Sequence, residues 1–250
     1  MIFRALSLAA AAARGMAARV EAIAQNIAHA ETPGYKRIET RFLGLLDRCL
    51  EGAGPGSSGL PERVFDQGIL RRTGRDLDIA IEGDGFLKVL LPDGAEAYTR
   101  GGSLRISAEG VLVTREGYPL EPPVVLPEGI ERVVVDAAGR VRGAAPGTGE
   151  AVEEIGQLGM VRFLNPAGLQ PLGANLYRAT ASSGEGREGR PGEEGFGWVR
   201  QGFLESSNVD VHRELADLMA ARRAFEINGK VVEAADEILQ AVNNLRRDRP

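Results

Sequence analysis

The stretch Asn26–Arg37, NIAHAETPGYKR, decides how this chain is organised, because a long helical pattern ends in it. Before it, apolar residues from Leu6 to Ala30 follow one another at alternating spacings of three and four, which predicts an amphipathic helix with a coiled-coil-like seam. A residue that precedes proline is disfavoured in the α region. We therefore expect the helix to end near Ala30 and Thr32-Pro33-Gly34 to form a turn.

A second helical pattern closes the chain, and we expect helix from Phe203 to Leu245. Ser206, Ser207 and Asn208 precede its regular part and are the N-cap candidates. Two seams run side by side along this segment. The first seam is Ala224, Ile227, Val231, Ala234, Ile238, Ala241 and Leu245, and the second is Phe225, Val232, Ala235, Leu239 and Val242. An apolar face this wide is expected on a helix that touches several neighbours.

The middle of the chain predicts short antiparallel strands. Apolar alternations are interrupted by turn sequences at residues 92–94, 101–102, 108–110 and 137–139, each of which we expect to reverse a hairpin. We also expect a strand over 155–163, a turn at 165–168 and a loop over 182–197 that contributes nothing to a core.

The sequence therefore predicts an α+β protein, with the N- and C-terminal helices paired in one helical layer and a central, mainly antiparallel β domain. The expected boundaries are 1–42 for the first helical segment, 43–63 for a linker, 64–202 for the β domain and 203–250 for the last helical segment. Residues 51–60, EGAGPGSSGL, have the composition of a flexible linker.

Composition and charge limit the possible partners. The formal net charge of −5 gives no general attraction to nucleic acid or to acidic membranes. The lone Cys49 excludes an intrachain disulfide. Arg4 followed by ALSLAAAAA has features of a signal peptide, but the helical seam continues past any plausible cleavage point, so we expect a mature helix without a cleaved signal. No apolar run reaches the roughly 18 residues of a membrane span.

A search for chemistry finds no strong motif. Asp76, Asp78 and Glu82 resemble a sparse calcium loop, but Ile81 and Leu87 stand where such a loop needs Gly and Glu. Solvent-facing strand carboxylates are the favoured interpretation of these acidic residues, and a tight turn is the favoured interpretation of residues 83–85.

The histidines and the charges of the last helix are no more specific. His29 and His212 each lie beside a predicted helix end and have no metal-ligand spacing. Arg222, Arg223 and Glu226 form either a solvated face or a set of register-setting charges between subunits. We therefore expect no catalytic residue, no cofactor and no metal.

Several segments resemble the flagellar basal-body rod and hook proteins. NIAHAETPGYKR is similar to the N-terminal signature of that family, and FDQGILRRTGRDLDIAIEGDGF from Phe65 to Phe86 is similar to the opening of its β domain. The segments from Gly173 to Gly184 and from Gln201 to Leu239 resemble its distal-rod members. The resemblance covers nearly the whole chain. Asn228-Gly229-Lys230 stands where the family has Asn-Ser-Lys, Phe225 replaces a Tyr, and 42–63 is shorter than in distal-rod members.

The resemblance implies a structural subunit of the flagellar rod, most like the distal rod, that self-assembles into a hollow helical drive shaft transmitting torque to the hook. It implies export by the flagellar type III apparatus into the periplasm. The implied partners are copies of the chain, adjacent rod and hook proteins and the surrounding P- and L-ring proteins, with no nucleic acid and no membrane insertion. A proximal rod or hook-type protein and a ligand-binding β module, suggested by Asp76, Asp78, Glu82 and Asp84, remain the alternatives.

The residues expected to carry assembly are seam positions and signature residues. They are Leu6, Met16, Val20, Ile23, Asn26, Ile27, Pro33, Gly34, Tyr35, Leu215, Leu218, Phe225, Ile227, Val231, Ile238, Leu239 and Leu245.

Overall fold

The computed structural model of the chain describes residues 2–40, 61–127, 129–130, 132–144 and 153–247. The chain divides into two compact units, and each is described by itself. Unit 1 contains 1–28, 37–64 and 209–250; unit 2 contains 29–36 and 65–208. The predicted linker at 51–60 and Cys49 lie outside the described residues.

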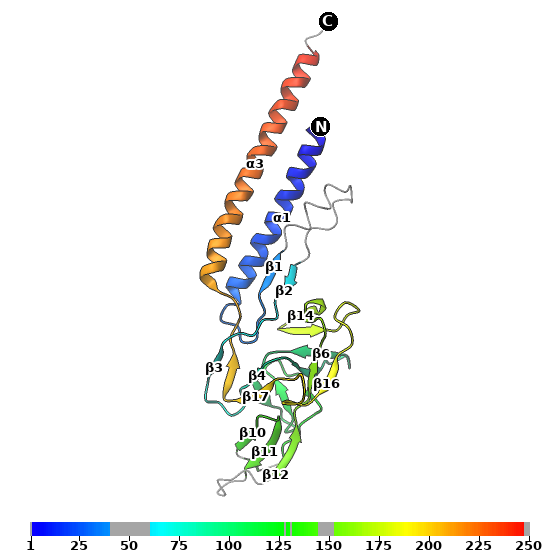
Figure 1. Cartoon of the computed structure of the whole chain (residues 1–250), viewed down its shortest axis with the longest axis vertical. Helices are drawn as coiled ribbons and strands as arrows, with labels where there is room; N and C mark the ends of the chain where they lie inside the picture. The colour runs from blue at the N-terminus through cyan, green and yellow to red at the C-terminus, as the bar shows by residue number, and fades with distance from the viewer. Residues whose placement is uncertain (1, 41–60, 128, 131, 145–152, 248–250) are drawn as a thin grey trace. The chain divides into compact units, whose positions relative to one another are not determined.

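Unit 1 consists of two long helices and a small hairpin-like sheet (Figure 1). Its elements are α1 (Ile2–Ala28), β1 (Ile38–Thr40), β2 (Pro61–Arg63) and α3 (Val211–Arg247). The two helices run antiparallel and side by side, and Arg19 Nη2 on α1 lies 2.9 Å from Asp217 Oδ1 on α3. β1 pairs antiparallel with β2.

The last helix begins later than the sequence predicts. Phe203–Glu205 forms strand β18, and α3 starts only at Val211. Ser206, Ser207 and Asn208 are therefore too early to be N-caps. Asp210 has that role, because its Oδ1 accepts hydrogen bonds from His212 N at 3.0 Å and Arg213 N at 3.3 Å.

Unit 2 is built from antiparallel strands. Its strands are β3 (Leu70–Arg72), β4 (Ile79–Glu82), β5 (Phe86–Leu90), β6 (Glu96–Thr99), β7 (Leu104–Ile106), β8 (Leu112–Thr114), β9 (Leu120–Glu121), β10 (Arg132–Val135), β11 (Arg140–Ala144), β12 (Glu153–Gln157), β13 (Met160–Arg162), β14 (Gln170–Gly173), β15 (Leu176–Arg178), β16 (Arg187–Gly189), β17 (Trp198–Gln201) and β18. A short 3-10 helix, η1 (Pro166–Gly168), precedes β14. The α+β class with a mainly antiparallel middle is confirmed.

The largest sheet of unit 2 has the order β14-β15-β6-β5-β13-β16, with β9 also pairing β5. A three-stranded sheet, β10-β11-β12, and the pairs β17-β4, β18-β3 and β7-β8 complete it. The main core is aliphatic, with Val89, Ala97 and Val141 fully buried. A second cluster is aromatic, with Phe86, Tyr98 and Tyr177 packed edge to face with Phe65 and Phe163.

Three local predictions for unit 2 hold, and three others are wrong. The turns at 92–94, 108–110 and 137–139 do join antiparallel neighbours. Residues 101–102 do not reverse a hairpin, because β6 pairs with β5 and β15 whereas β7 pairs with β8. The expected strand over 155–163 is divided between β12 and β13, which belong to different sheets. The segment 182–197 contributes β16 and the buried ring of Phe196, which packs in the main core.

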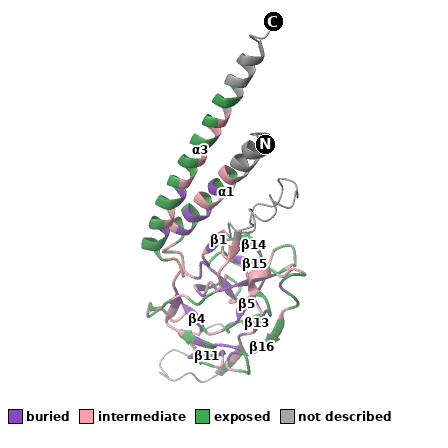
Figure 2. Ribbon diagram, turned by 45° about the horizontal axis from the view of Figure 1, so that its top comes forward, coloured by how far each residue is buried: buried purple, intermediate pink, exposed green. Residues whose placement is uncertain are grey.

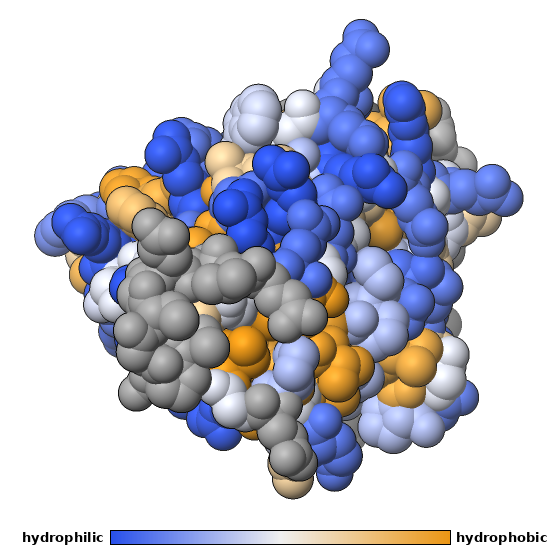
Figure 3. Space-filling view, turned by 90° about the horizontal axis from the view of Figure 1, so that it is seen from below, coloured by the Kyte–Doolittle hydropathy of each residue, from blue (hydrophilic) through white to orange (hydrophobic). Residues whose placement is uncertain are grey.

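The end of unit 2 that carries β10–β12 has a mostly hydrophilic surface broken by separate apolar patches (Figure 3). No helix among the described residues is long and apolar enough to cross a membrane.

Candidate assembly site

The two helices differ in how much of their apolar surface is covered. On α1, Met16, Ala22 and Ile23 are buried. On α3 most residues are exposed (Figure 2), and among the described side chains Ala221 is the one buried apolar residue. The α3 helix therefore gives a small part of its surface to α1.

The first predicted seam of α3 is the uncovered one. Ile227 is 62% exposed, Val231 48% and Ile238 54%, and Ala234 between them is also exposed. In the second seam Phe225 is exposed, whereas Val232 and Ala235 are half-buried. A spacing of four, three and four places Ile227 through Ile238 on one stripe of the helix. The result is a continuous apolar stripe with no cover inside the chain as described.

Asn26, the first residue of the signature segment, organises unit 1. Its side chain is fully buried and bonds both backbone groups of Ile38, with Nδ2 donating to the carbonyl at 2.8 Å and Oδ1 accepting from the amide at 2.8 Å. Nδ2 also donates to Glu214 Oε2 on α3 at 3.2 Å. Arg37 Nη1 lies 3.6 Å from Glu214 Oε1. One amide thus joins α1, β1 and α3.

The end of the signature segment is anchored in unit 2 by a buried ion pair. Lys36 Nζ donates to Glu205 Oε1 at 2.6 Å and to the carbonyl of Asp66 at 2.8 Å, and both charged side chains are about 1% exposed. Glu205 Oε1 also accepts from Gly68 N at 2.8 Å. Burial lowers the pKa of Lys36, against the opposing effect of the Glu205 carboxylate.

Arg100 completes this cluster. Its Nε lies 3.7 Å from Glu205 Oε2, its Nη2 donates to the Gly83 carbonyl at 2.8 Å, and its guanidinium lies 5.6 Å from the centroid of the Phe86 ring. Burial lowers the pKa of Arg100, and Glu205 opposes that effect. A carboxylate, a carbonyl and an aromatic face offset part of the cost of burying this cation. Arg100 Nε and Nη1 and Glu205 Oε2 nevertheless have no hydrogen-bond partner among the described residues.

The turn of the signature requires its glycine and is held by a hairpin. Gly34 has a φ of +72°, and a Cβ there would lie 2.9 Å from the backbone of Arg100, so no other residue fits without a shift. Asn175 Nδ2, in the tight connection between β14 and β15, donates to the Pro33 carbonyl at 3.0 Å. The ring of Tyr35 is buried and stacks on His29 with centroids 4.8 Å apart.

The predicted assembly residues therefore fall into four groups. Met16, Ile23, Asn26, Gly34 and Tyr35 are buried. Val20, Ile27, Pro33 and Leu218 are half-buried. Leu215, Phe225, Ile227, Val231 and Ile238 are exposed. The side chains of Leu6, Leu239 and Leu245 are outside the part that the structure describes.

The sequence did not single out Glu214, Lys36, Arg100 and Glu205 as partners. Lys36 and Arg100 lie in polar or turn-rich parts of the sequence, where charged side chains are normally exposed. Glu205 follows two adjacent apolar residues, Phe203 and Leu204, which gives no periodic signal that its side chain is buried.

The four acidic residues of the ligand-binding alternative do not form a site. Asp76 Oδ2 accepts from Arg132 at 3.0 Å, Glu82 Oε2 from Arg200 at 2.6 Å, and Asp84 lies 3.4 Å from Arg162. Asp78 is buried rather than solvent-facing, which corrects the interpretation made from the sequence, and accepts from Ser103. Among the described residues no group of three or more potential metal ligands occurs.

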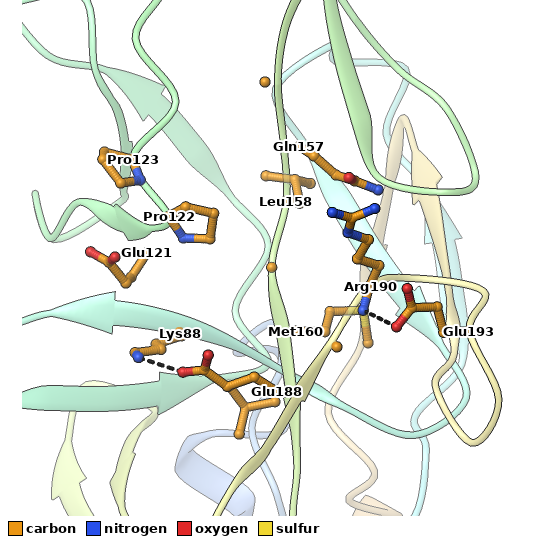
Figure 4. Close-up of a pocket in the computed structure, with 14 residues that line it drawn as sticks. Lys88, Glu121, Pro122, Pro123, Gln157, Leu158, Met160, Glu188, Arg190 and Glu193 are labelled. Carbon is orange, nitrogen blue, oxygen red and sulfur yellow. Dashed lines mark hydrogen bonds and ion pairs between the residues drawn. The ribbon is translucent and has the colours of Figure 1, made fainter.

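A groove of about 620 Å³ lies elsewhere in unit 2, between the Pro122–Pro123 segment and the strands β13 and β16 (Figure 4). One of its charged residues, Lys88, is paired with two carboxylates. Lys88 Nζ lies 2.7 Å from both Glu188 Oε1 and Glu96 Oε1, and although burial lowers the pKa of Lys88, these two carboxylates raise it above its usual range. None of the four acidic residues lines the groove.

A long helical pair with an uncovered apolar stripe, joined in sequence to an antiparallel β unit, is the arrangement expected of a protein that assembles through its helices. Comparison with known proteins agrees. Residues 80–143 match the family model of the flagellar hook protein FlgE/F/G D1 domain, and residues 200–245 match that of the flagellar basal body rod FlgEFG protein C-terminal region.

Relatives similar over nearly the full length make the assignment specific. The flagellar basal-body rod protein FlgG of Borreliella burgdorferi is 38% identical over 94% of this chain and 97% of its own length, and that of Caulobacter vibrioides is 38% identical with the same coverage. The rod protein FlgF of Escherichia coli is 31% identical over 89% of this chain and 90% of its own.

The chain belongs to the flagellar basal-body rod protein family, in its FlgG, or distal-rod, branch. It is a structural subunit of the basal-body rod and not an enzyme, as the sequence predicts.

Proposed function

We propose that the chain assembles through the uncovered stripe of α3, which packs against helices of neighbouring copies in a layer that lines a hollow shaft. The single observation that carries this proposal is the exposure of Ile227, Val231, Ala234 and Ile238 at seam spacing. Burying an aliphatic side chain of this size stabilises an assembly by about 1.5 kcal/mol or more, so covering the stripe with another helix is favourable.

The contact between copies is heterologous in this proposal, because the stripe meets a different surface of the next copy. Such contacts propagate as an open helix unless the rotation closes them into a ring. A helical layer with β units attached resists twisting and transmits torque. We also propose that the chain contacts adjacent rod and hook proteins and the P- and L-ring proteins around the shaft. We propose that it reaches the periplasm by type III export. Membership of the rod family supports these proposals.

The test replaces the stripe residues by a charge. Ile227→Asp combined with Val231→Asp should abolish rod assembly and motility, while the thermal unfolding of unit 2 stays unchanged. Lys230→Asp is the matched control, because it introduces the same carboxylate beside Val231 but off the seam, and it should still assemble. Electron microscopy of basal bodies gives the readout. Normal rods from the double variant would refute the role of the stripe.

A further inference from the structure

We propose that Asn26 and Glu214 lock the axial register of α1 against α3. The apolar contact between these helices carries limited register information, because both helices repeat alanine at spacings of three and four. The buried apolar residues are Met16, Ala22 and Ile23 on α1 and, among the described side chains of α3, Ala221. Sliding one helix by a turn, about 5.4 Å, would exchange small apolar groups for others like them.

The polar contact between Asn26 and Glu214 distinguishes one register from the others. The Asn26 side chain cannot turn freely, because its two polar ends are engaged by the amide and carbonyl of Ile38 at 2.8 Å each. Asn26 Nδ2 is therefore held in a fixed position, 3.2 Å from Glu214 Oε2. Arg37, next to Ile38, lies 3.6 Å from the other oxygen of Glu214. Groups from α1 and from the segment at 37–38 thus converge on one α3 carboxylate that is 2% exposed.

Any slipped register leaves this carboxylate badly placed. One turn along α1 from Asn26 is Ile23, and Leu218 and Ala221 lie one and two turns along α3 from Glu214. A slip would bring the charge of Glu214 against an aliphatic side chain, or the Asn26 amide against Leu218. Burying a charge or an amide without its partners is costly, whereas the apolar groups lose almost nothing by the exchange. A single buried asparagine selects the register of coiled coils by the same physics.

A second contact agrees with the same register. Arg19 Nη2 and Asp217 Oδ1 are 2.9 Å apart, but both side chains are about one-third exposed, so this pair adds less discrimination than the buried one. The consequence is that every copy presents the same combination of α1 and α3 side chains to its neighbours. The register of α1 against α3 is a property of one chain and does not depend on which surface the copies use.

The experiment measures a distance between the helices in the full chain. Cys49 is replaced by Ser, and nitroxide labels are attached at Glu21→Cys and Glu233→Cys, which are exposed and far apart along the two axes. Pulsed electron paramagnetic resonance at dilution should give one narrow distance for the parent. Asn26→Leu should give two or more distances about 5 Å apart. Met16→Leu, a buried apolar change at the same interface, should keep the single distance.

A conservative variant separates register from simple stability. Glu214→Leu removes the acceptor while Asn26 keeps both of its hydrogen bonds to Ile38, and it should broaden the distribution. Glu214→Gln keeps an oxygen that can accept from Asn26 Nδ2, and it should keep the parent distance. The proposal is overturned by a broad parent distribution, or by a single parent-like distance in Asn26→Leu or in Glu214→Leu. Circular dichroism of each variant identifies any loss of helix, and the comparison of Glu214→Leu with Glu214→Gln remains decisive in that case.

Discussion

Lys36 shows how a residue at the end of the signature segment acts on unit 2 as a whole. Its ammonium group donates to the Glu205 carboxylate and to the Asp66 carbonyl, so it joins three segments that are far apart in the sequence. A buried ion pair contributes little net stability compared with an apolar pair, but removal of one partner leaves an uncompensated charge. The arrangement therefore fixes where residues 29–36 lie without making unit 2 unusually stable.

Replacing Glu205 should cost more than replacing Lys36. Lys36→Met should lower the free energy of unfolding by about 3 kcal/mol, although Arg100 still lies 3.7 Å from the Glu205 carboxylate. Glu205→Gln should lower it further, because it leaves two buried cations, Lys36 and Arg100, without the carboxylate that they share. Urea unfolding followed by the fluorescence of Trp198, the only tryptophan of the chain, measures both. A loss in Glu205→Gln no larger than that in Lys36→Met would contradict the pairing argument.

Ala174 is a residue in an unfavourable backbone conformation. Its φ is +49°, in the left-handed region, where an L side chain costs about 1 kcal/mol or more relative to glycine. Ala174→Gly should therefore raise the free energy of unfolding by about 0.5 kcal/mol, after allowance for the greater freedom of glycine in the unfolded chain. Gly94→Ala, at a φ of +79° with open space around it, should lower it by about 1 kcal/mol. Changes of the same sign would refute the backbone explanation.

Tyr98 gives the β unit a dependence on alkaline pH. Burial, reinforced by the hydrogen bond from the Tyr98 hydroxyl to Glu96, raises the pKa of Tyr98 to about 12. Between pH 10 and 12 the unfolded chain loses this proton while the folded chain keeps it, so stability falls as the pH rises through that window. The difference in melting temperature between the parent and Tyr98→Phe should shrink from pH 9 to pH 12. A constant difference would contradict the shifted pKa.

At the scale of elements, the start of α3 depends on one side chain. Asp210 Oδ1 accepts from two of the first amides of the helix, and its charge also favours the positive end of the helix dipole. Asp210→Ala should destabilise the first turn by about 1 kcal/mol, visible as faster amide exchange of residues 211–214. Ser206→Ala should leave that exchange unchanged, because Ser206 lies before the helix. Equal amide exchange rates of residues 211–214 in the two variants would show that Asp210 is not the N-cap.

Elements set by local sequence could be predicted. The 3–4 spacing identified α1, and the glycine-containing turns at 92–94, 108–110 and 137–139 identified three hairpins, since strand, turn and strand adjoin in the chain. The start of α3 was misplaced because Phe203 and Leu204 are apolar at spacings that suit a helix as well as a strand. Residues 203–205 form a strand because they pair with β3, more than 130 residues away, and a local sequence pattern cannot predict such a distant partner.

The candidate site divides in the same way. The signature motif gave Asn26, Gly34 and Tyr35, and the seam gave the stripe that the structure leaves uncovered. The partners Glu214 and Glu205 are 188 residues from Asn26 and 169 from Lys36, so only the fold brings them together. Sequence periodicity also could not tell which of the two α3 seams meets α1, because both are apolar.

At the scale of the whole molecule, the chain passes between its two units several times. The segment 29–36 leaves unit 1 after α1, contributes Gly34, Tyr35 and Lys36 to unit 2, and returns at Arg37. A boundary drawn at the end of a helical signature near residue 42 therefore separates unit 2 from residues that it buries. The position of a truncation should decide whether unit 2 survives.

Two truncations test this interdependence. Deletion of 1–28 removes α1 and Asn26 but keeps the whole of 29–36, so unit 2 should fold with its parent stability while rod assembly is lost. Deletion of 1–41 also removes Lys36 and Tyr35, leaving Glu205 buried without the ammonium group 2.6 Å away. Its free energy of unfolding should fall by at least about 3 kcal/mol. Urea unfolding followed at Trp198, in unit 2, reports both, and equal stability of the two truncated chains would show that residues 29–36 are dispensable for the β unit.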